Sequence, residues 1–243
     1  MTPDEWFTEP DYARHLRFLE ARISARKQRL LAAAFSRAVW HLFDHPDLRA
    51  AVETAERFAD GRATAAELEA VRQRCREVAI REHEAWERSA DWDSPGSVLN
   101  ALRSRAAWAA AFTATTPVSA EDVADKLSTT AVEAQTGDSG ILIRDRVEWA
   151  RLMEEQQLVL RAVVWEVVGN PFAPVAFRAE WRTGTAVALA AQMYESGDFS
   201  AMPILADALQ DAGCDSDEVL DHCRNPGTHA RGCWVVDLVL GKS

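Results

Sequence analysis

The sequence predicts an all-α fold, a bundle of roughly ten helices with a compact C-terminal region of short helices. Apolar residues recur at spacings of three and four, as in Tyr12, His15, Leu16 and Leu19, which places them on one helix face. Capping residues and Gly or Pro punctuate these segments, and no segment shows the alternation of a half-buried strand. We expect a single domain over residues 1–243, with a subdivision into 1–135 and 141–243 as the alternative.

The first half of the chain divides into helices at residues that start or stop them. Ser24 can cap a helix that carries apolar residues as far as Phe43, and Pro46 suits the first turn of the next, which Gly61 ends. Thr64 and Glu67 form a capping box, in which each side chain satisfies a free backbone amide of the first turn. The predicted helices cover about 12–19, 24–43, 46–60, 64–88, 97–113 and 119–135.

The second half begins with the most linker-like stretch, Thr136 to Gly140. A long helix is predicted from about Ile143 to Val168, ended by Gly169, and the two prolines of Asn170–Pro174 exclude a helix there. Short helices with tight turns follow. They cover about 185–194, 202–212, 215–224 and 233–240.

Composition excludes several classes of protein. The chain has 27 Lys and Arg residues and 38 Asp and Glu residues, so its net charge is −11. A protein that binds nucleic acid over its whole surface needs a net positive charge, so this charge argues against that class. The hydrophobic fraction of 48% supports a core, yet no apolar run approaches the roughly 20 residues that a membrane helix needs. The acidic N-terminus lacks the features of a signal peptide, and the four cysteines fit reduced thiols. We expect a soluble cytoplasmic protein that does not bind membranes.

Charge is segregated along the chain. Between Thr183 and Cys223 there are eight acidic residues and no Lys or Arg, whereas basic residues gather near the second helix. These two faces are either solvated or pair with one another, within the chain or between chains. Tryptophans with polar neighbours are the other candidates for an interface. The predicted interaction residues are Arg22, Arg26, Lys27, Arg29, Trp6 and Trp92.

Cysteine and histidine concentrate near the C-terminus. Cys223, His229 and Cys233, with Cys214 as the fourth ligand or His222 in its place, could hold zinc, which takes four such ligands tetrahedrally. The spacing is not that of a standard zinc finger, and buried thiols are common in cores, so packing is the alternative. A nucleophilic thiol at Cys223 or Cys233, with His229 and Asp237 as base and orienting group, is a third interpretation.

Several segments together resemble an uncharacterised bacterial, planctomycete-type family of all-helical proteins. They are Asn170–Phe172, Pro203–Cys214, His222–Arg224 and His229–Gly241, with Arg26–Leu31, Trp40–Leu42 and Ala55–Gly61 near the N-terminus. The C-terminal part reads HCR…H-x-RGCWVVDLxLG. The family usually has a cysteine pair where this chain has Phe35 and Ser36. The resemblance implies a shared fold over one unit and implies no catalytic residues.

Motifs for chemistry are missing from the sequence. No GxxxxGK[ST] loop, strand-linked GxGxxG or GxSxG elbow occurs. The favoured interpretation is therefore a non-enzymatic helical module that binds a protein partner or a second copy of itself. The alternative is a protein that binds zinc or a small molecule through the C-terminal Cys/His cluster, with an enzymatic role left open.

Overall fold

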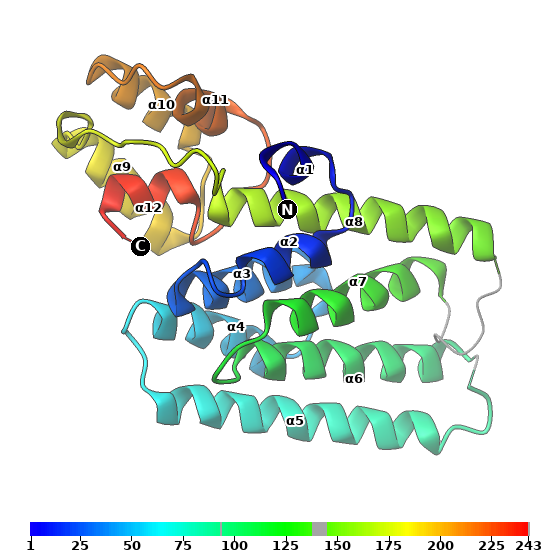
Figure 1. Cartoon of the computed structure of the whole chain (residues 1–243). Helices are drawn as coiled ribbons and strands as arrows, with labels where there is room; N and C mark the ends of the chain where they lie inside the picture. The colour runs from blue at the N-terminus through cyan, green and yellow to red at the C-terminus, as the bar shows by residue number, and fades with distance from the viewer. Residues whose placement is uncertain (93, 138–144, 243) are drawn as a thin grey trace. The chain divides into compact units, whose positions relative to one another are not determined.

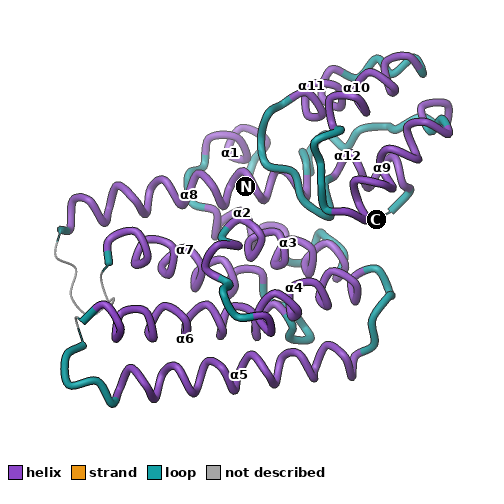
Figure 2. The backbone as a smooth tube through the Cα atoms, turned by 180° about the vertical axis from the view of Figure 1, so that it is seen from behind, coloured by secondary structure: helices purple, strands orange, loops and turns teal. Residues whose placement is uncertain are grey.

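The computed structural model describes residues 1–92, 94–137 and 145–242, and all regular structure in these ranges is helical, as the sequence predicts (Figure 1). Loops join the helices directly, with no strand among the described residues (Figure 2). The helices are α1 (Pro3–Thr8), α2 (Tyr12–Leu19), α3 (Ala25–Ala38), α4 (Pro46–Ala59), α5 (Ala65–Glu87), α6 (Pro95–Thr113), α7 (Ala120–Thr136), α8 (Arg146–Val168), α9 (Gly184–Ser196), α10 (Met202–Asp211), α11 (Asp217–Arg224) and α12 (Trp234–Leu240). Two short 3₁₀ helices, Trp40–Leu42 and Ala179–Trp181, complete them.

The helix N-caps predicted from the sequence are confirmed, and the structure differs from the prediction mainly where helices end. Ser24 and Ser119 cap α3 and α7, and the capping box at Thr64 opens α5. The predicted helix to Phe43 is wrong in its last turn, because the backbone leaves helical geometry at Val39 and continues as a 3₁₀ turn. The N-terminal helix α1 was missed, since six residues are too few for a periodic signal.

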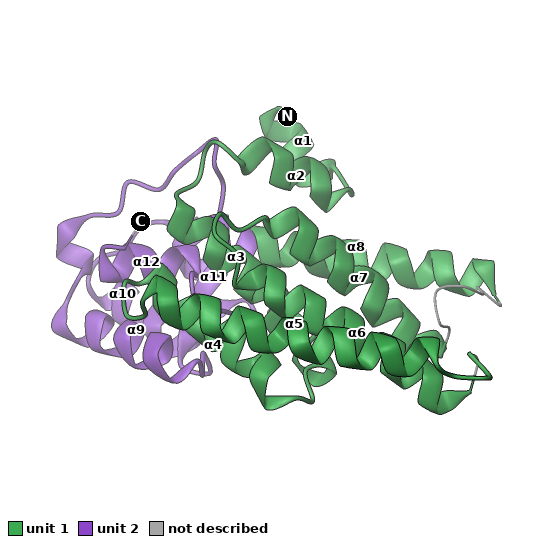
Figure 3. Cartoon of the chain, turned by 90° about the horizontal axis from the view of Figure 1, so that it is seen from below, with its two compact units in different colours: residues 1–164 green, residues 165–243 purple. Residues whose placement is uncertain are grey.

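The chain divides into two compact units, Met1–Val164 and Trp165–Ser243 (Figure 3). The division falls within α8, a helix without a break in its backbone, and not at the linker-like stretch that suggested units of 1–135 and 141–243. Positions 138–140 of that stretch and the predicted helix start at Ile143 lie outside the described residues.

Unit 1 is a helical bundle built around α3 to α7. Each of these helices packs against the next along the chain, and α7 packs back against α3. The most extensive contact joins α5 and α6, which lie side by side (Figures 1 and 2). Small side chains permit this close approach. The buried face of α6 includes Ala101, Ala106, Ala107, Ala109, Ala110 and Ala111.

Unit 2 contains the end of α8 and helices α9 to α12. Gly169 ends α8 with a positive φ of 70°, and residues 170–178 form the non-helical connector that the prolines predict. Phe177 packs edge-on against Trp181 at 5.2 Å between ring centroids. Helix α9 contacts α10 and α12, and α10 contacts α11, around an apolar core. The four short helices thus enclose an apolar core.

In the described parts of the chain, every helix is too short or too polar to cross a membrane.

Candidate metal centre

Four side chains of metal-binding type meet inside unit 2. Glu166 projects from the last turn of α8 and His222 from α11. His229 lies in the loop that follows α11, and Cys233 is the N-cap residue of α12. One ligand atom from each of the four lies within 4.8 Å of the others. We call this group the Glu166 cluster.

The distances between these atoms are short. His222 Nε2 lies 3.2 Å from Glu166 Oε2 and 3.2 Å from Cys233 Sγ. His229 Nδ1 lies 3.0 Å from the same Oε2, and the Ala230 backbone amide donates to the other carboxylate oxygen. Both imidazole rings therefore lie against the same carboxylate oxygen, Glu166 Oε2.

Glu166 is a buried carboxylate, with its side chain 7% exposed. Burial alone would raise the pKa of its carboxyl group, but the hydrogen bonds from His222 and His229 outweigh burial and lower the pKa to about 2. Its place near the C-terminus of α8 is unfavourable for a negative charge. The two imidazoles offset that cost, so the site holds an ionised carboxylate among neutral or cationic rings.

His229 is the more enclosed of the two rings. Burial lowers its pKa, but the Glu166 carboxylate and the backbone of Asn225 together raise it by more, so the net pKa of His229 lies above its usual value. His229 Nε2 has no partner at normal hydrogen-bond geometry. In the metal-free protein, the Glu166–His229 contact is therefore an ion pair over part of the pH range.

Cys233 is fully buried, at 0% exposed. Burial raises the pKa of its thiol well above the usual value, and the Glu166 charge raises it further. A nucleophilic cysteine needs the opposite, an accessible thiolate with a lowered pKa. The geometry does not favour the nucleophile that the sequence left open, whereas a metal ion would itself displace the thiol proton.

The predicted zinc ligands divide into two pairs. His229 and Cys233 lie in the Glu166 cluster, together with His222, which the sequence offered as an alternative fourth ligand. Cys214 and Cys223 lie outside it and pack in the apolar core of unit 2. Burial raises the pKa of the Cys223 thiol to about 12, as expected for a packed side chain. Cys214 and Cys223 are therefore packed core side chains, as in the alternative to zinc binding that the sequence left open.

Glu166 is absent from the ligands that the sequence predicts, and it stands 56 positions before His222. A signal was present, because Glu166 is the one charged residue between Arg161 and Arg178 and lies among Val163, Val164, Trp165, Val167 and Val168. A carboxylate in such a run is buried only when it has a partner. Which partner it has depends on the tertiary structure.

The cluster supplies the four ligand atoms of a tetrahedral zinc site. With bonds of about 2.0 Å to nitrogen and oxygen and 2.3 Å to sulfur, the ligand atoms of zinc lie roughly 3.3–3.5 Å apart. The three shortest separations, from 3.0 to 3.2 Å, would have to expand slightly to reach that range, and the widest, up to 4.8 Å, would have to contract. Ligation by Glu and Cys anions and two neutral His rings would also leave a buried Zn²⁺ complex with no net charge.

Most of the predicted interaction residues make contacts within unit 1. Arg26 pairs with Asp60 at 3.0 Å, and the buried Arg29 donates to the Thr113 carbonyl. Arg22 donates to the Phe18 carbonyl, also within this unit. Lys27 is half-buried on the first turn of α3.

The two predicted interface tryptophans differ in exposure. Trp6 is 1% exposed and packs against His15, so it belongs to the core, contrary to what its polar neighbours suggested. Trp92 is 51% exposed, with its ring 5.8 Å from that of Trp86. Trp92 is thus the aromatic residue of the predicted set that lies on the surface.

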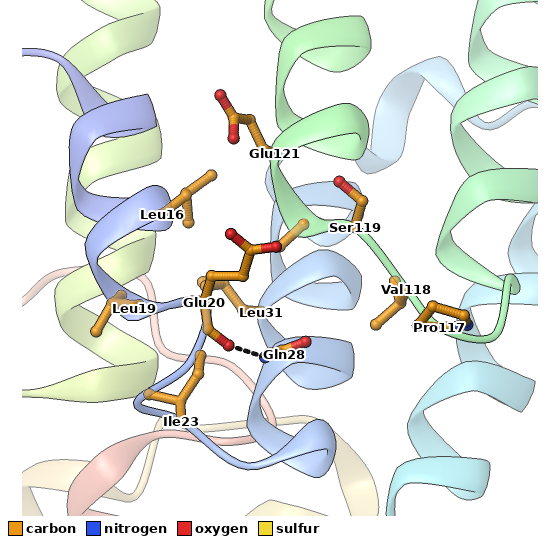
Figure 4. A pocket seen from close by; sticks show the side chains of 11 residues that line it. Leu16, Leu19, Glu20, Ile23, Gln28, Leu31, Pro117, Val118, Ser119 and Glu121 are labelled. Atoms are coloured by element: carbon orange, nitrogen blue, oxygen red, sulfur yellow. Dashed lines mark hydrogen bonds between the residues drawn. The ribbon is translucent and has the colours of Figure 1, made fainter.

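Unit 1 also contains an open cavity of about 240 Å³ between α2, α3 and the start of α7 (Figure 4). Its buried lining is apolar, with Leu16, Leu19 and Leu31. Glu20 and Glu121 also line it, and the Gln28 amide donates to the Glu20 carbonyl at 2.6 Å. The cavity holds no cluster of metal-binding or nucleophilic groups comparable with the Glu166 cluster.

No family model, curated protein or solved structure matches this chain.

Proposed function

We propose that this protein binds a divalent transition metal, with zinc the best fit, through Glu166, His222, His229 and Cys233. The observation that supports the proposal is the convergence of four ligand atoms, from three helices or helix ends and one loop, within 4.8 Å. These groups are buried or nearly so, and carboxylate, imidazole and thiol groups are the side chains that bind zinc in proteins.

The ligand chemistry favours zinc over calcium or magnesium. Hard cations prefer oxygen ligands, whereas this site offers one oxygen, two nitrogens and one sulfur. A ligand set that mixes nitrogen and sulfur is typical of zinc. The proposal therefore concerns the zinc-binding alternative that the sequence raised, with Glu166 and His222 in the ligand set in place of Cys214 and Cys223.

The test is zinc titration of the full chain against a chromophoric chelator, with native mass spectrometry to count ions. We expect one zinc per chain, and loss of at least about 100-fold in affinity for Cys233→Ser and His229→Gln. Cys214→Ser is the matched control, because it removes a buried thiol of the same unit outside the cluster. Failure of the folded wild-type chain to bind zinc, or unchanged binding by Cys233→Ser, would refute the proposal.

A docking role for unit 1 is the second candidate, in line with the interaction module that the sequence favours. The open apolar cavity beside Leu16, Leu19 and Leu31 supports it, because such a cavity accepts an apolar side chain of a partner. Ile23→Glu, at the lining of the cavity, should weaken binding of any partner purified with the wild-type chain. Ile80→Glu, on an exposed position of α5 away from that lining, is the control.

A further inference from the structure

A hydrogen bond from Trp234 determines where His222 carries its proton. The indole Nε1 of Trp234 donates to His222 Nδ1 at 3.1 Å, and the two rings lie 5.1 Å apart at 61°. Because an indole nitrogen is a donor only, Nδ1 must be the acceptor. The neutral imidazole then has its hydrogen on Nε2, the atom that faces Glu166 and Cys233.

This arrangement is the reverse of the one that a metal ligand needs. A ligating histidine presents a lone pair to the ion and donates from its other ring nitrogen. Here Nε2 carries the hydrogen toward the site, and Nδ1 has its lone pair occupied by Trp234. Nε2 can therefore bind an ion only after the indole N–H has left Nδ1.

The Trp234 ring packs against the backbone of Gly169. A Cβ atom at Gly169 would lie 3.0 Å from two atoms of the indole ring, so the ring packs directly on a residue that has no side chain. Trp234 also follows Cys233 directly, at the start of α12. The indole is thereby held against His222 from a position next to the cluster.

We propose that Trp234 opposes metal binding by holding His222 with its hydrogen on Nε2, and that metal binding breaks the Trp234–His222 hydrogen bond. This inference rests on the proposed function. On binding, the Cys233 thiol releases its proton to solvent, and the proton on His222 Nε2 is replaced by one on Nδ1. Trp234 is a positioning residue, since it acts on the ion only through His222.

The size of the effect follows from the strength of a neutral hydrogen bond. Such a bond changes an equilibrium constant by roughly tenfold. A fourth protein ligand contributes more than this to zinc affinity, since structural zinc sites are almost always four-coordinate. We therefore expect His222 to become a ligand, with an affinity roughly tenfold below that of a site without the indole donor.

The experiment compares zinc affinity for the full-length wild-type chain and Trp234→Phe, using zinc ions alone as the probe. Phe retains a ring against Gly169 but has no N–H, so binding should tighten by roughly tenfold. Trp181→Phe is the control, because Trp181 is a buried tryptophan of the same unit whose indole donates to the Gly213 carbonyl at 3.2 Å. The zinc affinity of Trp181→Phe should equal that of the wild type.

A second measurement needs no variant at the site. In ¹⁵N-labelled wild-type protein, zinc should shift the indole N–H resonance of Trp234 and leave that of Trp181 unchanged. Zinc binding with an unmoved Trp234 resonance, or with equal or weaker affinity in a folded Trp234→Phe, overturns the inference, whereas the proposed zinc site itself is tested separately by Cys233→Ser and His229→Gln. Absence of zinc binding by the wild type and Trp234→Phe overturns both.

Discussion

Glu166 is the residue on which the candidate centre depends most. Its Oε2 atom lies within 3.2 Å of both imidazole nitrogens that face the cluster. A buried carboxylate is stable only with such partners, and in turn it orients the rings. Removing its charge should therefore affect both the free energy of unfolding and metal binding.

For the metal-free protein, Glu166→Gln should lower the free energy of unfolding by about 1–3 kcal/mol, because two rings lose a charged acceptor. Denaturant unfolding at neutral pH with a chelator present measures the change. Glu148→Gln, on an exposed ion pair of the same helix, should leave the midpoint unchanged. Equal midpoints for both variants would show that the cluster adds nothing to stability.

Titration of the same residues predicts how stability depends on pH without metal. The raised pKa of His229 means that its contribution is fully present below 6.5 and is lost as pH rises through its folded-state pKa. The lowered pKa of Glu166 means that its contribution is present above 4.5 and is lost as pH falls toward about 2. The contribution of the pair is thus largest between about pH 4.5 and 6.5.

Denaturant midpoints of the wild type and Glu166→Gln across pH 4–9 would test this dependence. The difference between the two should shrink as pH rises above the folded-state pKa of His229. Zinc affinity should have the opposite dependence and strengthen with rising pH, because the ion needs neutral imidazole and a thiolate. A difference that grows with pH in the presence of chelator would contradict the ion pair.

At the scale of elements, the ends of helices bring the site together. Glu166 lies at the end of α8, His222 on the short α11, and Cys233 at the start of α12. Gly169 allows α8 to stop with a positive φ and lets Trp234 pack on its backbone. The glycine therefore links the termination of one helix to the position of a side chain on another.

Gly169→Ala should destabilise the protein by roughly 1–3 kcal/mol more than Gly197→Ala, because only the first adds a methyl group against a ring. The two glycines end α8 and α9 with nearly equal φ values of 70° and 72°, so the backbone strain is matched. A Cβ at Gly197 meets nothing within 4 Å. Thermal unfolding of the two variants measures both losses of stability. Equal losses would show that the added methyl group does not disturb the Trp234 ring.

At the scale of the whole molecule, all four residues of the Glu166 cluster belong to unit 2. An ion that binds only the folded form stabilises it by about 2.7 kcal/mol when its concentration is 100 times its dissociation constant. We expect that stabilisation to appear in the unit that supplies the ligands.

Hydrogen exchange of the full chain, with and without zinc, would test this expectation. Protection should increase at the end of α8 and in α11 and α12, and should change little in α4 to α6 of unit 1. Cys233→Ser provides the zinc-independent baseline. An increase in protection spread evenly over both units would contradict zinc binding at the Glu166 cluster.

Local signals in the sequence specify the helical class and the starts of most helices, because caps, prolines and apolar spacing act over a few residues. They also indicate that His229 and Cys233 belong to a chemically distinct region. They do not show that Cys214 and Cys223 lie outside the Glu166 cluster or that Trp6 is buried, because burial depends on residues distant in the chain.

Only the tertiary structure brought Glu166 to His222 and His229 and placed the Trp234 indole on His222 Nδ1. The physical reason is that ligand geometry depends on how helices pack and where they end. The sequence shows how Cys and His are spaced along the chain, whereas the groups that contact a buried carboxylate such as Glu166 depend on how distant segments pack.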